Sequence, residues 1–312
     1  MEEAEFSHLP VMVREVVELL LPVPTGLVID ATVGGAGHAA AVLDARPDLS
    51  LLGIDRDAAA VAVARSRLAR FGDRAVVVHG GFEGMARIAA QHDIADVSGV
   101  LMDLGVSSHQ LDRAERGFSY RFDAPLDMRM DAKQTLTAAT VLNEYDEATL
   151  AQVIANFGEE RFARRIAREV VRARPIATTF ELVDAIKRAI PAPARRRGGH
   201  PARRTFQAIR MEVNRELPNL AEGLDESVHL VGAGGRVLVL AYHSLEDRLV
   251  KHTFEEWAGR RDDEPAKMPV VVTRNPLARL VTRRALRPSP EELASNPRSE
   301  SVRLRGVERL PQ

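Results

Sequence analysis

Residues 28–40 read VIDATVGGAGHAA, an apolar run that ends at Asp30 and leads into a glycine-rich turn and an alanine-rich segment. This order predicts a buried strand, a tight turn and a helix that ends near Arg46. In an open α/β sheet, ligands bind where the strands end, against the N-terminus of the helix that follows such a turn. The stretch therefore predicts a fold and the place of a site within it.

Similar strand-like runs follow at residues 51–55, 75–80 and 97–105, with helical segments between them. After Gly105 the sequence becomes helical and strongly charged to about His200, and strand-like sequence returns only at residues 234–243 and 301–309. We expect one doubly wound α/β sheet with an all-helical insertion between its fourth and fifth strands. The expected domains are a core of residues 1–106 and 206–312 and an inserted domain of residues 107–205.

The composition excludes several classes of protein. Hydrophobic residues make up 45% of the 312 residues and charged residues 28%, which is typical of a globular chain. The acidic start MEEAEFSHLP is unlike a secretory signal, so we expect a cytoplasmic protein. Cysteine is absent, which rules out disulfides, thiolate metal ligands and cysteine nucleophiles. The net charge of -1 requires any nucleic-acid contact to come from local basic patches.

Three ligand classes compete for the glycine turn. A P-loop would end in Gly-Lys-Ser/Thr, which is absent, and the pyrophosphate of a dinucleotide would meet the negative charge of Asp30. S-adenosylmethionine reverses that objection because its sulfonium and amino groups are cationic. Asp55 ends the second strand at the spacing of a ribose ligand, and Asp103 ends the fourth strand at the same edge. A turn that serves only tight helix packing remains the alternative.

Longer motifs carry a family resemblance. The segments are HLPVMVREVV (8–17), DLGVSSHQLDRAERGFSYRFDAPLDMRMD (103–131), FGEERFARRIAREVVRAR (157–174), HPARRTFQAIRMEVNREL (200–217), HSLEDRLVK (243–251) and NPRSESVRLRGVER (296–309). They span almost the whole chain and closely resemble the bacterial 16S rRNA cytosine-N4 methyltransferase family, also called the ribosomal RNA small subunit methyltransferase H family.

The resemblance implies methyl transfer from S-adenosylmethionine to the exocyclic nitrogen of a cytidine in the decoding region of 16S rRNA, on a nearly complete small ribosomal subunit. With the turn glycine Gly34, it implies a cofactor pocket formed by Ala36, Gly37, His38, Asp55, Phe82, Asp103 and Gln110. Some members have two glycines before the histidine, where this chain has Ala36 and Gly37. The methyl group of Ala36 would be strained if its φ is positive.

Catalysis at cytosine N4 needs an acceptor for an N4 hydrogen, because the amino lone pair is delocalised into the ring. The expected catalytic residues are Asp103, Ser107 and His243, with Ser108 nearby. The alternative is that Asp103 only holds the cofactor. For His243 and Ser244 the alternative to substrate contact is that Ser244 caps the next helix with Asp247. His8 is expected in a flap over the site. No ligand spacing calls for a metal.

RNA contacts are expected from the basic loop RRRGGHPARR (195–204) and from Tyr120 in GFSYRF. Phe118 is expected in the core of the insertion, whereas Tyr120 and Phe122 are candidates for stacking on a flipped cytidine. The expected substrate-binding residues are Tyr120, Arg195, Arg196, Arg197, Arg203 and Ser244. A solvated basic surface remains the alternative for the loop.

Two other functions fit the sequence. One is methylation of another RNA or of DNA, although the missing two-proline motif speaks against DNA amino-methylation. The other is a non-catalytic rRNA-binding assembly factor for the small subunit. A homodimer through VVVTRNPLARLV (270–281) is compatible with the sequence, which does not decide it.

Overall fold

The computed structural model describes residues 10–105, 114–195, 199–260, 276–296 and 299–311. The chain forms two compact units: Met1–Gly105 with Leu217–Gln312, and Val106–Glu216. Each has its own hydrophobic core. The described helices include none with the length and apolar character needed to cross a membrane.

The first unit is built on a seven-stranded sheet in the order β3-β2-β1-β4-β5-β7-β6. The first five strands in this order are parallel, and β7 and β6 add antiparallel strands at one edge. The strands are β1 (Gly26–Asp30), β2 (Leu49–Asp55), β3 (Ala75–His79), β4 (Val97–Asp103), β5 (Val231–Ala241), β6 (Ala278–Leu280) and β7 (Arg303–Arg309).

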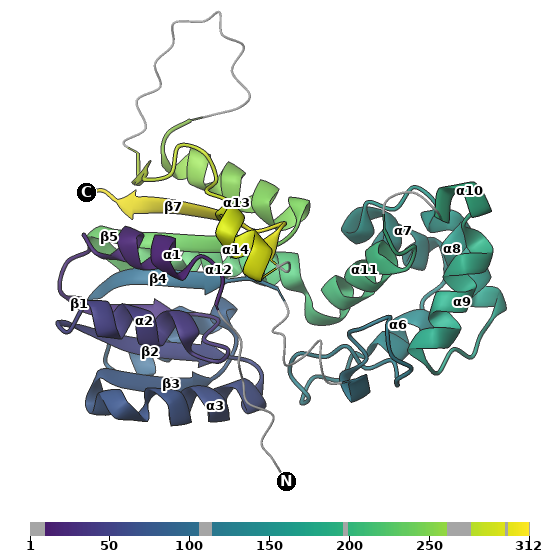
Figure 1. Ribbon diagram of the computed structural model, residues 1–312, viewed down its shortest axis with the longest axis horizontal. Coiled ribbons are helices and arrows are strands. Elements are labelled where there is room, and N and C mark those ends of the chain that lie inside the picture. Colours follow the sequence, from purple (N-terminus) through teal and green to yellow (C-terminus); the bar gives the residue numbers. More distant parts are fainter. Residues whose placement is uncertain (1–9, 106–113, 196–198, 261–275, 297–298, 312) are drawn as a thin grey trace, which may run out of the picture. The chain divides into compact units, whose positions relative to one another are not determined.

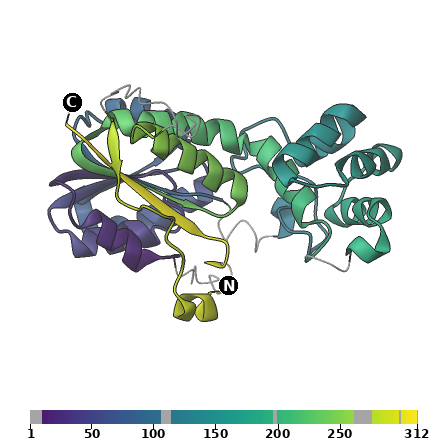
Figure 2. The same ribbon diagram turned by 90° about the horizontal axis from the view of Figure 1, so that it is seen from above.

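Helices cover both faces of this sheet, as the view in Figure 2 shows. Leucines and valines from α1 (Val13–Leu20), α2 (Gly37–Ala45) and α3 (Ala58–Leu68) pack on one face. The other face is covered by α4 (Met85–Gln91), α12 (Glu216–Leu230) and α13 (Ser244–Trp257). Because both faces are buried, β4 is apolar or small almost throughout, with all of its residues buried except Asp103. The expected doubly wound α/β fold is confirmed. The short strand β6 was not expected.

The described residues of the second unit are helical or irregular, with one isolated bridge between Pro125 and Thr178 (Figure 1). Its helices are α6 (Ala138–Glu144), α7 (Glu147–Gly158), α8 (Ala163–Arg172), α9 (Thr179–Ala189), α10 (Ala192–Arg195) and α11 (Arg203–Asn214). Helix α8 buries Ile166 and Val170 and exposes its arginines, as the helical spacing predicts. Phe118 lies in the core of this unit, as expected.

The second unit begins close to the expected boundary but ends later in the sequence than expected. The first falls at Gly105, next to the expected residue 106. The second falls at Glu216 rather than at residue 205. Helix α11 belongs to the second unit because Phe206, Ile209 and Val213 are part of its core. Short elements complete the chain, namely the 3-10 turns η1 (Ala69–Arg74), η2 (Phe82–Gly84) and η3 (Ala114–Arg116) and the helix α14 (Pro290–Ser295).

Candidate active site

Three aspartates end neighbouring parallel strands and therefore share one edge of the sheet. Asp30 is the last residue of β1, Asp55 of β2 and Asp103 of β4. Strand β1 lies between β2 and β4, where the chain order along the sheet reverses. This is the place at which open α/β sheets bind their ligands.

The glycine turn is fixed from the second strand. The N–H of Val33 donates to the carbonyl of Ile54 (2.9 Å), and the N–H of Gly34 donates to Oδ2 of Asp55 (2.9 Å). The other oxygen of Asp55 accepts the N–H of Asp57 (2.8 Å). Burial raises the pKa of Asp55, although these two hydrogen bonds oppose the shift. Asp55 thus orders the turn, which is a role that the sequence did not reveal.

Ala36 and Gly37 show why the turn needs small residues. Ala36 is fully buried with φ 59°, the left-handed region that an alanine adopts only at a cost. The strain anticipated for this residue is therefore present. At Gly37 an added Cβ would lie 2.5 Å from Cγ of Pro10. The segment before α1 thus packs directly against the start of α2.

Asp103 is positioned by two residues that follow the neighbouring strands β1 and β5. Its backbone N–H donates to Oγ1 of Thr32 (2.6 Å), and its Oδ1 accepts the hydroxyl of Tyr242 (2.8 Å). Tyr242 directly follows β5. Burial, reinforced by the charge of Asp103, raises the pKa of Tyr242 well above its ordinary value, so the hydroxyl remains a donor. Neither partner was expected from the sequence. The one signal for Tyr242 was its place at a strand end beside His243.

His38 lies in the first turn of α2 and is buried. Its Nε2 lies 2.8 Å from the carbonyl oxygen of Val11, which can only accept, so Nε2 carries a hydrogen. Its Nδ1 lies 3.6 Å from Oδ2 of Asp103. A proton on either of these two groups replaces a contact between lone pairs with an attractive one.

Asp30 is the most deeply buried of the three carboxyl groups. It accepts a hydrogen bond from the N–H of Thr32 (3.3 Å). Burial raises its pKa to about 7, His38 opposes the rise, and Asp103 and Asp55 add to it. An anion is disfavoured here unless a cation comes close.

These groups fit S-adenosylmethionine. Burial penalises the charge of both Asp30 and Asp55, so a cationic ligand stabilises the ionised forms. Phe82, another expected pocket residue, lies in η2 with the guanidinium of Arg56 5.6 Å from its ring centre. An added Cβ at Gly223 of α12 would lie 2.6 Å from the Phe82 ring. Glycine there lets α12 pack closely on this residue.

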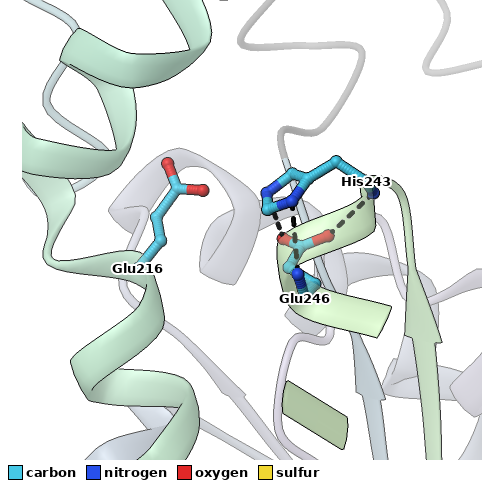
Figure 3. A group of neighbouring side chains, drawn as sticks. All are labelled: Glu216, His243 and Glu246. Atoms are coloured by element: carbon cyan, nitrogen blue, oxygen red, sulfur yellow. Dashed lines mark hydrogen bonds and ion pairs between the residues drawn. The ribbon is translucent and has the colours of Figure 1, made fainter. Parts of the chain in front are cut away.

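His243 is the N-cap of α13, where Ser244 had been considered (Figure 3). Its Nδ1 accepts the N–H of Glu246 (3.3 Å), and Oε2 of Glu246 accepts the N–H of His243 (3.2 Å). The proposed cap of Ser244 with Asp247 is therefore wrong, because β5 ends at Ala241 and the helix begins one residue too early for it. Asp247 instead binds the guanidinium of Arg305 (2.7 Å).

Nε2 of His243 is buried without a hydrogen bond within the described residues, and it lies 3.2 Å from Oε1 of Glu246. Figure 3 also draws Glu216, the last residue of the second unit, whose carboxylate forms two 2.7 Å hydrogen bonds with Arg210.

The expected RNA-binding residues belong to the second unit, except Ser244. Tyr120 stacks on His200, and Arg195 and Arg203 are exposed. Residues 106–216 contain 20 lysines and arginines against 15 aspartates and glutamates, a net charge of +5, whereas the rest of the chain has 23 against 29, a net charge of -6. Expectations for His8, Ser107, Ser108, Gln110, Arg196 and Arg197 fall outside the described residues.

Comparisons with known proteins agree over nearly the full length. The model of the MraW methylase family matches residues 5–310. Ribosomal RNA small subunit methyltransferase H of Symbiobacterium thermophilum is 52% identical over 310 residues, 98% of this chain and 97% of that protein. The protein of the same name from Heliobacterium modesticaldum is 46% identical over 311 residues, 98% of this chain and 99% of its own length.

A solved SAM-dependent O-methyltransferase from Thermotoga maritima aligns with 96% of this chain and 65% of its own, at a TM-score of 0.40 and 9% identity. A likeness this distant carries no argument about the present chain.

Proposed function

The chain belongs to the MraW methylase family, and from this we propose that it methylates N4 of a cytidine in the decoding region of 16S rRNA, with S-adenosylmethionine as methyl donor. Two relatives named ribosomal RNA small subunit methyltransferase H, matched over almost their full length, support an rRNA substrate. The proposed setting is the cytoplasm, and the proposed substrate is a nearly complete small subunit.

The observation that carries the proposal is the group of carboxylates at the strand ends. Asp30, Asp55 and Asp103 offer acceptor oxygens and buried negative charge at the place where such a sheet binds its ligand. When bound there, S-adenosylmethionine supplies an electrophilic methyl group on a cationic sulphur. Asp30 and Asp55 favour that positive charge, and Asp55 also holds the glycine turn in place.

Asp103 is the proposed acceptor for the N4 hydrogen. Attack by N4 forms the N–C bond as the S–C bond breaks, and the nitrogen then carries a hydrogen that must leave. A carboxylate at the end of β4, fixed by Thr32 and Tyr242, receives it. His243 and Ser244 follow β5, the neighbouring strand, and are proposed to contact the cytidine.

The second unit is the proposed RNA-binding domain. Its net charge of +5 within a chain of net charge -1 concentrates positive charge where phosphates can be neutralised. Arg195 and Arg203 are exposed there and are proposed phosphate contacts, together with Arg196 and Arg197.

The test is methyl transfer from labelled S-adenosylmethionine to small subunits purified from a strain that lacks this protein, followed by nucleoside analysis. We expect label in N4-methylcytidine and loss of that label with D103N, which keeps the shape of the side chain and removes its basicity. Label in another nucleoside refutes the N4 assignment. Binding of RNA and cofactor without transfer points instead to an assembly factor.

A further inference from the structure

A stack of aromatic rings runs outward through the second unit. Phe206 is buried in the core, and its ring meets Tyr120 edge-on with centres 5.7 Å apart. Tyr120 is partly buried and stacks on His200 with ring centres 4.4 Å apart and planes within 4° of parallel. His200 is the exposed end of this stack. One face of its ring covers Tyr120, and the residue as a whole is exposed.

The ring of His200 is fixed in orientation and protonation. Its Nδ1 accepts the N–H of Ala202 (3.3 Å), at the residue that precedes α11, and an acceptor nitrogen carries no proton. Partial burial, with the charges of Lys187 and Arg121, lowers the pKa of His200 below its ordinary value. The ring is therefore neutral at physiological pH and flat against Tyr120.

The charges near this ring indicate its partner. Lys187 and Arg121 lie close enough to act on it electrostatically, and Arg203 follows three residues later on α11. An exposed aromatic plane beside cations is the arrangement by which proteins bind single-stranded nucleic acid, in which a base stacks and its phosphates are neutralised.

We propose that His200 is a stacking platform for an unpaired RNA base, with Arg121 and Lys187 binding the adjacent phosphates. The inference rests on the proposed function because it names a contact for its RNA substrate. It adds a residue that the expected substrate-binding set lacks. Tyr120 supports the platform from behind and does not itself offer an open face to the base.

The experiment compares H200A with H200F in the full chain. The probe is a fluorescently labelled 12-nucleotide oligoadenylate, and affinity is measured by anisotropy at several salt concentrations. Both substitutions remove the hydrogen bond to Ala202, but only H200F keeps an aromatic plane. We expect H200A to weaken binding by about 5- to 100-fold with an unchanged salt slope, and H200F to stay within about threefold of wild type.

A second probe, an RNA duplex of equal length, checks that stacking is the cause, because paired bases are not available to the ring. H200A should leave its affinity within about twofold of wild type. Equal losses for H200A and H200F would assign the effect to the lost hydrogen bond with Ala202 and overturn the inference. No loss with H200A, or no binding of the single strand by wild type, would overturn it as well. Single-strand binding without methyl transfer to small subunits would overturn the proposed function alone.

Discussion

Replacing Asp30 with asparagine should stabilise the protein increasingly as the pH rises. The pKa of Asp30 is raised from 3.8 to about 7, so the folded state favours the protonated form. The associated stability is fully present below pH 3.8 and is lost as the pH rises through 7. A difference of about three pKa units corresponds to roughly 4 kcal/mol of unfolding free energy at pH 8, of which about 2–3 kcal/mol is lost between pH 5 and pH 8.

D30N keeps the shape of the side chain and can still accept the N–H of Thr32, but it cannot ionise. The assay is thermal or urea unfolding of wild type and D30N at pH 5, 6, 7 and 8 without cofactor. Groups distant from Asp30 titrate alike in both proteins, so the difference between them reports Asp30 together with its neighbours His38, Asp55 and Asp103. We expect the advantage of D30N to grow by about 2–3 kcal/mol over this range.

D44N is a matched control for the substitution itself, because Asp44 is an exposed aspartate. A stability difference between wild type and D30N that stays constant from pH 5 to pH 8 would refute the reasoning, since it would mean that Asp30 ionises normally in the folded protein.

Further predictions concern the same edge of the sheet and the second unit. Because a cation favours ionised Asp30, calorimetry should show S-adenosylmethionine binding more tightly at pH 8 than at pH 6, and D30N should flatten this dependence. A36G relieves the strain of the left-handed backbone at this residue and should raise the unfolding free energy by about 1 kcal/mol. A lower unfolding free energy for A36G than for wild type would mean that the strain is absent. Y242F should lower kcat roughly tenfold with little change in cofactor affinity, and D103N should lower kcat by at least about 100-fold. R203Q should reduce the salt slope of RNA binding by about one, and an unchanged slope would remove Arg203 from the phosphate contacts.

The sequence predicted the sheet well because its strands are buried on both faces. Runs such as LLGID (51–55) and VSGVLMDLG (97–105) are apolar or small almost throughout, and alanine-rich segments of helical length stand between them. Strand β6 was missed because its three residues, Ala278–Leu280, are too few to show a pattern. The expected end of the second unit, residue 205, lay near the start of α11. This helix has one apolar face, and the sequence of that face does not tell which of the two cores it packs against.

The site residues that lie at strand ends could be predicted from the sequence. The contacts between residues far apart in the sequence could not. The places of Asp30, Asp55 and Asp103 follow from the ends of their strands. The hydrogen bond from Tyr242 to Asp103 joins residues 139 positions apart, which no local pattern reveals. Serine is a common N-cap, which made Ser244 the alternative cap of α13, whereas His243 fills that place through its ring nitrogen.

The pairing of β4 with β5 has a consequence for how the chain folds during synthesis. Strand β4 ends at Asp103, and its neighbour β5 begins at Val231. Roughly 130 residues must therefore be made before β4 gains its second partner. At bacterial translation rates of about 5–20 residues per second, one side of β4 stays uncovered for about 6–25 s. The second unit has its own core and can fold in that interval. Its folding shortens the flexible chain that separates β4 from β5. A nascent chain stalled before Val231 would present the bare edge of β4 to other chains, so truncation there should produce aggregates rather than an inactive enzyme.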